Sequence, residues 1–312
     1  MNHESNENLD STLEWVNWMD GLIIEDAFRK EKIFLYSYSD FKDLKVIGVG
    51  SNGNVCKATT RSSRKNVVLK PISLTKDYSH KDLIKEIKRY RQLELHGNIL
   101  KLYGITKQDQ NSHVYLVVFE YSDGGSLRQF LKENHETISW HTKLQLSKQL
   151  VGALMWLHGN DIVHGHLSSS KVLVCKGKIK LNPFGIVRRT NESRGLMEKF
   201  MGPVQYADPR YLEIFQSIGR KKSVDIYSLG IILWEISSAR EPYKSESKST
   251  YELIDEICNG KRETILDEVP REYSKIFQDC WHHDERRRPN IDQVFEALDN
   301  VDTKSKSKLG EI

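Results

Sequence analysis

The sequence predicts an α+β fold with two lobes, and two observations carry that prediction. Residues 41–121 alternate short segments of β-type pattern with one helical segment, whereas from residue 122 onward apolar residues recur mostly at helical spacing. The composition, with 38% hydrophobic residues, 19 Gly and only 7 Pro in 312 residues, is typical of a globular protein. We therefore expect a small β-rich N-lobe at 41–121 and a larger helical C-lobe at 122–300.

The hydrophobic pattern divides each lobe into elements. In the N-lobe we expect strands at 44–48, 54–59, 66–72, 100–105 and 114–121 and a helix at 80–95; in the C-lobe we expect helices near 139–158, 223–239, 248–260 and 273–283. Residues 1–40 are expected to form an arm that is disordered at 1–10 and extended at 33–39. A helix with Trp15 and Trp18 on one face is expected to begin in this arm at Ser11 or Thr12. The polar segment 301–312 is expected to be a frayed tail.

Charge, cysteine content and hydropathy limit the partners. The net charge of +4 is too small to indicate a nucleic-acid partner. The four cysteines lie far apart and show no metal-ligand spacing, which fits reduced thiols. The N-terminus lacks the apolar core of a secretory signal, and the longest apolar run, 231–234, is far too short to span a bilayer. We therefore expect a soluble cytoplasmic protein without a metal site.

A glycine-rich turn is predicted between the first two strands. The segment GVGSNGNV at 48–55 has the pattern G-x-G-x-x-G-x-V, in which glycine lets the backbone approach phosphate oxygens. A strand follows the turn, whereas a dinucleotide fold would have a helix there. Further along the chain, the segment VVLK ends at Lys70, which makes Lys70 a candidate phosphate-binding residue. A surface lysine on an edge strand is the alternative.

Glu86 is the candidate partner of Lys70. It lies in the helix expected at 80–95, close to the apolar face formed by Leu83, Ile87 and Tyr90. A charge at the inner edge of a helix needs a partner, and Lys70 can supply it. A surface glutamate is the alternative.

Further motifs follow in order. They are FEY at 119–121 with GGSL at 124–127, SVDIYSLG at 223–230 with WE at 234–235, and CW at 280–281 with Asp284 and Arg288-Pro289. Together with the glycine-rich turn, they resemble the eukaryotic protein-kinase domain over residues 41–300, with a likeness to its tyrosine-kinase-like branch. The set is highly specific because every motif stands at the spacing of the family.

The resemblance implies ATP as the cofactor, with an adenine ring between Val55, Val68 and Leu173. It also implies that Asp225 braces the catalytic loop by accepting hydrogen bonds. The residues expected to bind the cofactor are Gly48, Gly50, Gly53, Val55, Val68, Lys70, Glu86, Glu120 and Leu173. The residues expected to stack through the assembled domain are Tyr90, Leu102, His164 and Phe184.

The positions that carry phosphoryl-transfer chemistry depart from the family pattern. The catalytic loop reads HGHLSSSK at 164–171 in place of H-R-D-L-x-x-x-N, and the metal-binding motif reads PFG at 183–185 in place of D-F-G. His166 thus replaces the base, and Lys171 and Pro183 replace the two Mg²⁺ ligands. We expect weak nucleotide binding without Mg²⁺, in which Lys171 neutralises phosphate charge.

Two more departures concern regulation. Gly165 replaces the arginine that receives a phosphorylated activation loop, although Thr190, Ser193 and Tyr206 remain candidate modification sites. The A-P-E motif reads DPR at 208–210, which removes the glutamate expected to pair with Arg288. Glu213 is a possible substitute partner, and the substrate-side segment is expected to be mobile or rebuilt.

Three readings of the function stay open. The first is a pseudokinase that binds signalling proteins, among them an active kinase. The second is a divergent active Ser/Thr or Tyr protein kinase that recruits the side-chain oxygen of Asn182, or a carboxyl group elsewhere, for the metal. The third is an effector whose fold is switched by the N-terminal helix, and for this reading the arm should be dispensable for the fold.

Overall fold

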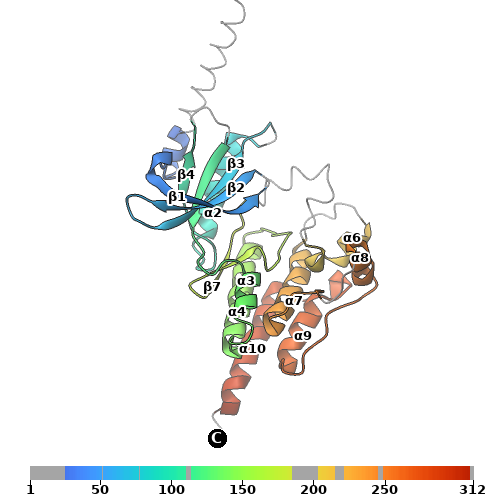
Figure 1. The fold of residues 1–312 in the computed structure, drawn as a ribbon. Helices are drawn as coiled ribbons and strands as arrows, with labels where there is room; N and C mark the ends of the chain where they lie inside the picture. Colours follow the sequence, from blue (N-terminus) through green and yellow to red (C-terminus); the bar gives the residue numbers. More distant parts are fainter. Residues whose placement is uncertain are drawn as a thin grey trace, which may run out of the picture. The chain divides into compact units, whose positions relative to one another are not determined.

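The computed structural model describes residues 25–50, 52–76, 78–109, 114–184, 203–214, 221–244 and 249–309. The chain divides into two compact units, a first unit of residues 1–94 and 100–121 and a second unit of residues 95–99 and 122–312. The first unit is rich in strands and the second is mostly helical, which confirms the predicted α+β fold (Figure 1). The helix predicted from Ser11 or Thr12, with Trp15 and Trp18, lies outside the described residues.

The first unit is built on an antiparallel sheet of five strands in the order β1-β2-β3-β5-β4. The strands are β1 (Phe41–Gly50), β2 (Gly53–Thr60), β3 (Asn66–Ser73), β4 (Leu102–Lys107) and β5 (Val114–Glu120). Helix α2 (His80–Leu93) begins at Ser79, whose side chain accepts a hydrogen bond from the backbone N–H of Asp82. The Tyr90 ring of α2 lies 5.7 Å from the Phe119 ring of β5, so α2 covers the sheet face to which Phe119 belongs.

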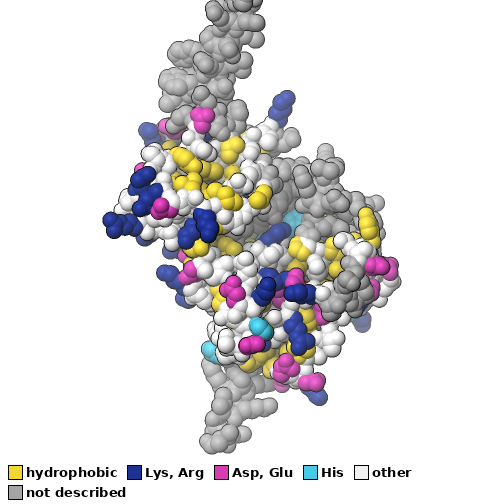
Figure 2. Space-filling view, viewed as in Figure 1, with side chains coloured by type: hydrophobic (Ala, Val, Ile, Leu, Met, Phe, Trp, Pro, Cys, Tyr) yellow, Lys and Arg dark blue, Asp and Glu magenta, His cyan; other side chains and the backbone are white. Residues whose placement is uncertain are grey.

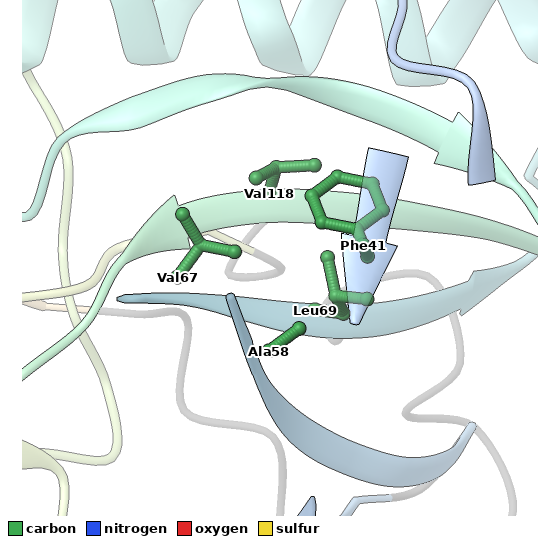
Figure 3. Close-up of a cluster of buried hydrophobic side chains, with 5 residues drawn as sticks. All are labelled: Phe41, Ala58, Val67, Leu69 and Val118. Carbon is green, nitrogen blue, oxygen red and sulfur yellow. The ribbon is translucent and has the colours of Figure 1, made fainter. Parts of the chain in front are cut away.

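The opposite face of the sheet carries a cluster of buried apolar side chains. The cluster consists of Phe41, Ala58, Val67, Leu69 and Val118, which come from four strands (Figure 3). In β3 the side chains alternate between the two faces, so Val67 and Leu69 enter this cluster while Val68 and Lys70 face α2. The two-residue period of a strand therefore separates the core of the first unit from its candidate site.

Residues 25–40 are part of the first unit rather than a detached arm. Residues 25–30 are helical, and the fully buried Phe28 ring packs edge-on against Tyr115 at 6.1 Å. Leu35 forms a parallel bridge with Ile105 of β4, which confirms extended backbone at this point of the predicted segment 33–39. The 3-10 helix η1 (Tyr38–Asp40) then leads into β1.

The second unit is a helical assembly with one small hairpin. Its elements are α3 (Leu127–Glu133), α4 (Trp140–Gly159), β6 (Val172–Cys175), β7 (Lys178–Leu181), η3 (Val204–Tyr206), α6 (Pro209–Ile214), α7 (Lys222–Ser238), α8 (Thr250–Cys258), α9 (Arg271–Cys280), η4 (Glu285–Arg287) and α10 (Ile291–Leu309). Helix α7 buries residues on all its sides and packs against α4 and α9, so it forms the centre of the unit. The backbone of α10 is helical to Leu309, whereas a frayed tail was expected from residue 301. Among the helices of the described ranges, none is long and apolar enough to cross a membrane.

Candidate functional site

The glycine-rich turn joins β1 to β2 in the first unit. Gly48 pairs with Val55, and Gly50 pairs with Gly53 at the tip of the hairpin. Gly53 has a φ of 122°, which L side chains rarely adopt, and a Cβ there would also lie 3.5 Å from the Pro71 ring. A Cβ at Gly48 would have no heavy atom within 4 Å. Backbone geometry therefore favours glycine at position 53, whereas the fold leaves room for a side chain at position 48.

Lys70 lies on the face of the sheet that α2 covers. It pairs with Val117 of β5, and Val68 pairs with Phe119 two residues away on the same face. Lys57 of β2 pairs with Val68, so Val55, two residues from Lys57, belongs to this face as well. The sequence-predicted residues Val55, Val68 and Lys70 are thus brought together on one surface of the first unit.

Glu86 occupies the buried stripe of α2 and is 7% exposed. Its carboxylate accepts a hydrogen bond from the hydroxyl of Tyr78, a residue that is itself 3% exposed. The sequence analysis missed Tyr78, because it lies before α2 and belongs to none of the motifs. The helix therefore carries Glu86 toward the face that holds Lys70, and the predicted ion pair between the two residues stays a prediction.

Glu120 ends β5 and is tied to the start of β4. Its backbone N–H donates to the carbonyl of Lys101 at 2.9 Å, and its carboxylate accepts from the N–H of Lys101 at 3.3 Å. The next residue, Tyr121, lies with its ring 4.4 Å from the ammonium of Lys57. Glu120 is thus held by backbone and side chain at the end of the first unit, and its predicted contact with a nucleotide stays a prediction.

Asp225 braces the catalytic loop, as the family resemblance implied. It lies in the first turn of α7, is fully buried, and accepts the backbone N–H groups of His164 and Gly165, each at 2.7 Å. The Nε2 atom of His158 lies 2.9 Å from the same carboxylate. Gly165 has a φ of 74°, a conformation that glycine adopts without the steric cost of a side chain. The loop backbone is therefore fixed although its chemistry differs from the family pattern.

The three degenerate positions lie in the second unit. The backbone N–H of His166 donates to Nδ1 of His164 at 3.4 Å, and the N–H of Lys171 donates to the carbonyl of Ser168 at 3.0 Å. Both side chains are half-buried, whereas Pro183 is buried. The side-chain oxygen of Asn182 accepts the N–H of Phe184 at 3.0 Å. Lys171 has only donors and Pro183 has no polar side-chain atom, so this pair does not fit the oxygen coordination that Mg²⁺ requires.

The remaining predicted residues are divided between the two units. Leu173 lies in β6 of the second unit, opposite Lys180 of β7, and is half-buried. The four residues expected to stack are all buried: Tyr90 and Leu102 in the first unit, and His164 and Phe184 in the second. The adenine site and the stack therefore stay predictions.

A buried polar network joins the catalytic loop to α7. Glu235 is 1% exposed and accepts from Arg128 Nε at 2.6 Å, from Tyr206 at 2.6 Å and from Ser169 at 2.8 Å. Burial raises the pKa of Glu235, and the neighbouring Arg128 opposes that rise. Burial also raises the pKa of the Tyr206 hydroxyl. Tyr206 is 3% exposed, so the expectation that it is an accessible modification site is wrong for this conformation, whereas Thr190 and Ser193 lie outside the described residues.

The partner of Arg288 differs from the expected one. The guanidinium of Arg288 donates from Nη2 to Asp208 at 3.0 Å and from Nη1 to the other oxygen of the same carboxylate. The expected loss of an ion pair at Arg288 is therefore wrong, because Asp208 supplies the carboxylate two residues before Arg210. The side chain of Glu213, the suggested substitute, lies outside the described residues. The pair of Arg288 and Asp208 holds the start of α6 with a carboxylate from a position other than the family's, and the prediction that the substrate-side segment is mobile or rebuilt stays a prediction.

Comparison with known proteins agrees with this architecture. Residues 41–298 match the family described as protein tyrosine and serine/threonine kinase. A probable LIM domain-containing serine/threonine-protein kinase of Dictyostelium discoideum is 29% identical over 207 residues, which cover 66% of this chain and 31% of that protein. Serine/threonine-protein kinase Nek5 of Mus musculus is 27% identical over 266 residues, 82% of this chain and 40% of that protein.

Mitogen-activated protein kinase kinase kinase 7 of Drosophila melanogaster is 26% identical over 274 residues, 85% of this chain and 38% of that protein. The chain thus spans less than half the length of these three relatives. The family match begins at the first residue of β1 and ends within α10, and therefore covers most of both units and every motif described above. With its β-rich first unit, its helical second unit and its braced catalytic loop, the chain belongs to the protein tyrosine and serine/threonine kinase family.

Proposed function

We propose that the chain is a pseudokinase that binds ATP or a related nucleotide and acts by binding signalling proteins rather than by transferring a phosphoryl group. One observation carries the proposal. The catalytic loop is held by Asp225 at two consecutive N–H groups, yet Lys171 and Pro183 stand at the positions of the metal ligands. Loss of the hydrogen bonds from the loop to Asp225 would indicate that the domain no longer keeps the kinase structure. A loop that keeps these hydrogen bonds but lacks the metal ligands favours a role in binding.

The charge at these positions argues against turnover. Phosphoryl transfer depends on metal ions that neutralise the charge developing on the phosphate, and the residues present do not fit those ions. Loss of a single electrostatic stabiliser lowers the rate by roughly 10²–10³, and both ligands are replaced here. The imidazole of His166 can accept a proton, but it does not replace the oxygen ligands that Mg²⁺ requires.

Nucleotide binding without Mg²⁺ is supported by the positive charge that remains. Lys70 lies on the α2-facing surface together with Val55 and Val68, which suit an adenine ring and its phosphates. The ammonium of Lys171 can neutralise phosphate oxygens in place of a metal ion, because both are compact cations. We propose that these residues hold the nucleotide weakly.

A divergent active kinase is the second candidate, favoured by the relatives that are named serine/threonine-protein kinases. Such an enzyme would need a new oxygen ligand for Mg²⁺. Asn182 is the candidate that the sequence suggested, but its side-chain oxygen already accepts the N–H of Phe184. This contact favours the pseudokinase.

We further propose that the partners are signalling proteins, among them an active kinase. We also propose a cytoplasmic location and a place in the tyrosine-kinase-like branch of the family. The first partner class follows from the retained fold, since a braced scaffold without turnover can still present a surface that an active kinase recognises.

A thermal-shift titration of the full chain with ATP, in Mg²⁺ and in EDTA, tests the proposal, because a ligand that binds only the folded state raises the melting temperature. We expect a shift that survives EDTA and is lost in Lys171→Met but kept in Lys178→Met, a matched change at an exposed lysine of β7. A parallel assay with radiolabelled γ-phosphate should detect no transfer to protein.

The other outcomes discriminate between the readings. A shift that requires Mg²⁺, together with transferred label, would establish the divergent kinase. The absence of a shift in both buffers would leave a scaffold that binds no nucleotide and would contradict the proposed role of Lys70 and Lys171.

A further inference from the structure

We propose that the acidic N-terminal segment of this chain, residues 1–24, docks onto an apolar face of its own first unit. The surface involved, called the β1 patch below, lies on the sheet face opposite α2. It consists of Phe34, Tyr36, Tyr38, Val46, Tyr103 and Leu116.

Two members of the β1 patch are exposed, and the other four are half-buried. Phe34 is 59% exposed and Val46 is 51% exposed, and the Phe34 and Tyr36 rings touch at a centroid distance of 4.5 Å. The members that pack against the core cluster of Figure 3 are Tyr36, Tyr38, Tyr103 and Leu116. Val46 pairs with Cys56, which also packs against that cluster. Figure 2 shows hydrophobic side chains gathered on the face of the first unit that is turned toward the viewer. Exposed apolar surface of this kind marks an interaction site.

The surroundings of the β1 patch are basic. The turn 61–65 between β2 and β3 holds three Lys or Arg residues and no acidic residue, whereas Lys42, Lys45 and Lys57 lie on the α2-facing side of the sheet. Arg61, Arg64 and Lys65 are exposed at the turn between β2 and β3, and Arg61 donates to the carbonyl of Ser39 at 2.8 Å, directly after Tyr38 of the patch. The occupant of the patch should therefore be apolar with acidic flanks.

Residues 1–24 have this composition. They contain five acidic residues and no Lys or Arg. Among the acidic residues stand Trp15, Trp18 and Leu22, which are large apolar side chains. Charge complementarity thus selects this segment over a basic or neutral partner.

The point of attachment favours docking within one molecule. The segment ends at residue 24, and the helix that follows at 25–30 is anchored to the first unit by Phe28. The chain then continues to Phe34 and Tyr36, which are themselves members of the β1 patch. At about 3.3 Å per extended residue, 24 residues can reach about 80 Å, so the patch is accessible from this anchor. Short tethers give effective concentrations in the millimolar range, which an external partner rarely matches.

Fluorine NMR of the full chain labelled with 5-fluorotryptophan tests the docking. The chain has six Trp residues, and Trp15 and Trp18 can be assigned with Trp15→Phe and Trp18→Phe variants because the others lie in the second unit. We expect their resonances to differ from those of a synthetic peptide of residues 1–24. Val46→Asp, which adds a repelling charge to an exposed position, should return them to the peptide values.

Two control variants separate docking from a loss of fold. Val46→Lys makes the same position polar but attracts the acidic segment, so it should keep the shifted resonances. Tyr251→Asp adds the same charge at an 82% exposed side chain of the second unit and should change nothing. Peptide-like resonances in the unaltered chain would overturn the proposal, and so would shifted resonances that ignore Val46→Asp. Shifts that appear only as the protein concentration rises would show docking onto a second copy and would overturn the intramolecular assignment.

Discussion

Arg288 and Asp208 form a buried ion pair with two hydrogen bonds, and their side chains are 1% and 2% exposed. Arg288 also donates from Nε to the carbonyl of His282 at 2.7 Å and from Nη1 to the carbonyl of Ser223 at 3.0 Å. The guanidinium therefore ties the start of α6 to the start of α7 and to the loop after α9. The carboxylate that the family pattern places at position 210 is supplied here from position 208.

Asp208→Ala should lower the free energy of unfolding by about 3–5 kcal/mol, because it leaves the buried Arg288 charge without its partner. Urea denaturation monitored by circular dichroism measures this loss. Arg210→Ala is the matched control, since Arg210 is 37% exposed and lies 3.9 Å from Glu285; this change should cost less than about 1 kcal/mol. Equal costs for the two variants would mean that Asp208 does not hold Arg288.

The hydroxyl of Tyr227 is buried, and within the described ranges no hydrogen-bond partner is found for it. Burial raises the pKa of this hydroxyl to about 12. Because an unpaired buried hydroxyl is costly, Tyr227→Phe should leave the free energy of unfolding unchanged or raise it by about 1 kcal/mol. The ring would still lie near the guanidinium of Arg288, at 5.1 Å.

Tyr273→Phe is the counterpart of that change. The hydroxyl of Tyr273 donates to the carbonyl of Leu233 at 3.0 Å and lies 2.7 Å from the hydroxyl of Ser147. Its removal should lower the free energy of unfolding by about 1–3 kcal/mol, because a buried carbonyl and a buried hydroxyl lose a partner. Chemical denaturation of both variants checks the pair, and a larger loss in Tyr227→Phe would contradict the assignment of an unpaired hydroxyl.

A contact of this architecture could be predicted from local sequence patterns only when its residues are close along the chain, and not when they are far apart. The VVLK motif placed Lys70 in a strand, and the helix period placed Glu86 on the buried stripe of α2, because both depend on the local sequence. The partner of Arg288 lies 80 residues away, and the sequence gives no direction for its side chain. The contact of Tyr78 with Glu86 was missed for a similar reason, since a loop residue has no periodicity.

The short hairpin of β6 and β7 shows another limit. Each strand has four residues, which is too short for an alternating pattern to stand out. The family motif at 223–230 did predict that Asp225 braces the catalytic loop. That prediction came from the resemblance to the kinase family and not from hydrophobic periodicity. Family motifs and hydrophobic periodicity therefore predict different residues of the site.

Asp284 should show a strongly acidic titration. Hydrogen bonds from the Arg286 side chain and backbone lower the pKa of its carboxyl from 3.8 to about 2. A carboxyl whose pKa falls on folding stabilises the folded state above the unfolded pKa, and this contribution is lost as the pH falls from about 4 through about 2. Carboxyl carbon NMR should find the low pKa, and Arg286→Ala should raise it toward 3.8.

Arg287→Ala controls for the loss of a nearby positive charge. The Nη1 atom of Arg287 lies 3.4 Å from His282, and Arg287 forms no ion pair with Asp284 in the described part of the chain. This variant should leave the pKa of Asp284 near its low value. An identical rise in both variants would assign the shift to general charge instead of the specific contact with Arg286.

The backbone at Phe34 packs so closely against Gly104 of β4 that there is no room for a side chain at position 104. A Cβ on Gly104 would lie 2.1 Å from the carbonyl oxygen of Phe34 and 3.0 Å from its carbonyl carbon. Those atoms belong to backbone that bonds to β4, because Ile105 donates to Phe34 at 3.0 Å and Tyr36 donates to Ile105 at 2.9 Å. The backbone of Phe34 cannot move away from a Cβ at position 104 without loss of these hydrogen bonds.

Gly104→Ala should therefore lower the free energy of unfolding by about 1–3 kcal/mol, the usual cost of forcing extra atoms into a packed site. Hydrogen exchange should show faster exchange at the amides of Tyr36 and Ile105, since the bridge between the arm and β4 would open. Gly97→Ala is the matched control, because a Cβ there has no heavy atom within 4 Å. Normal stability of Gly104→Ala would mean that residues 25–40 are dispensable for the first unit, as an effector arm would be. A loss confined to Gly104→Ala would instead make these residues a structural part of the sheet.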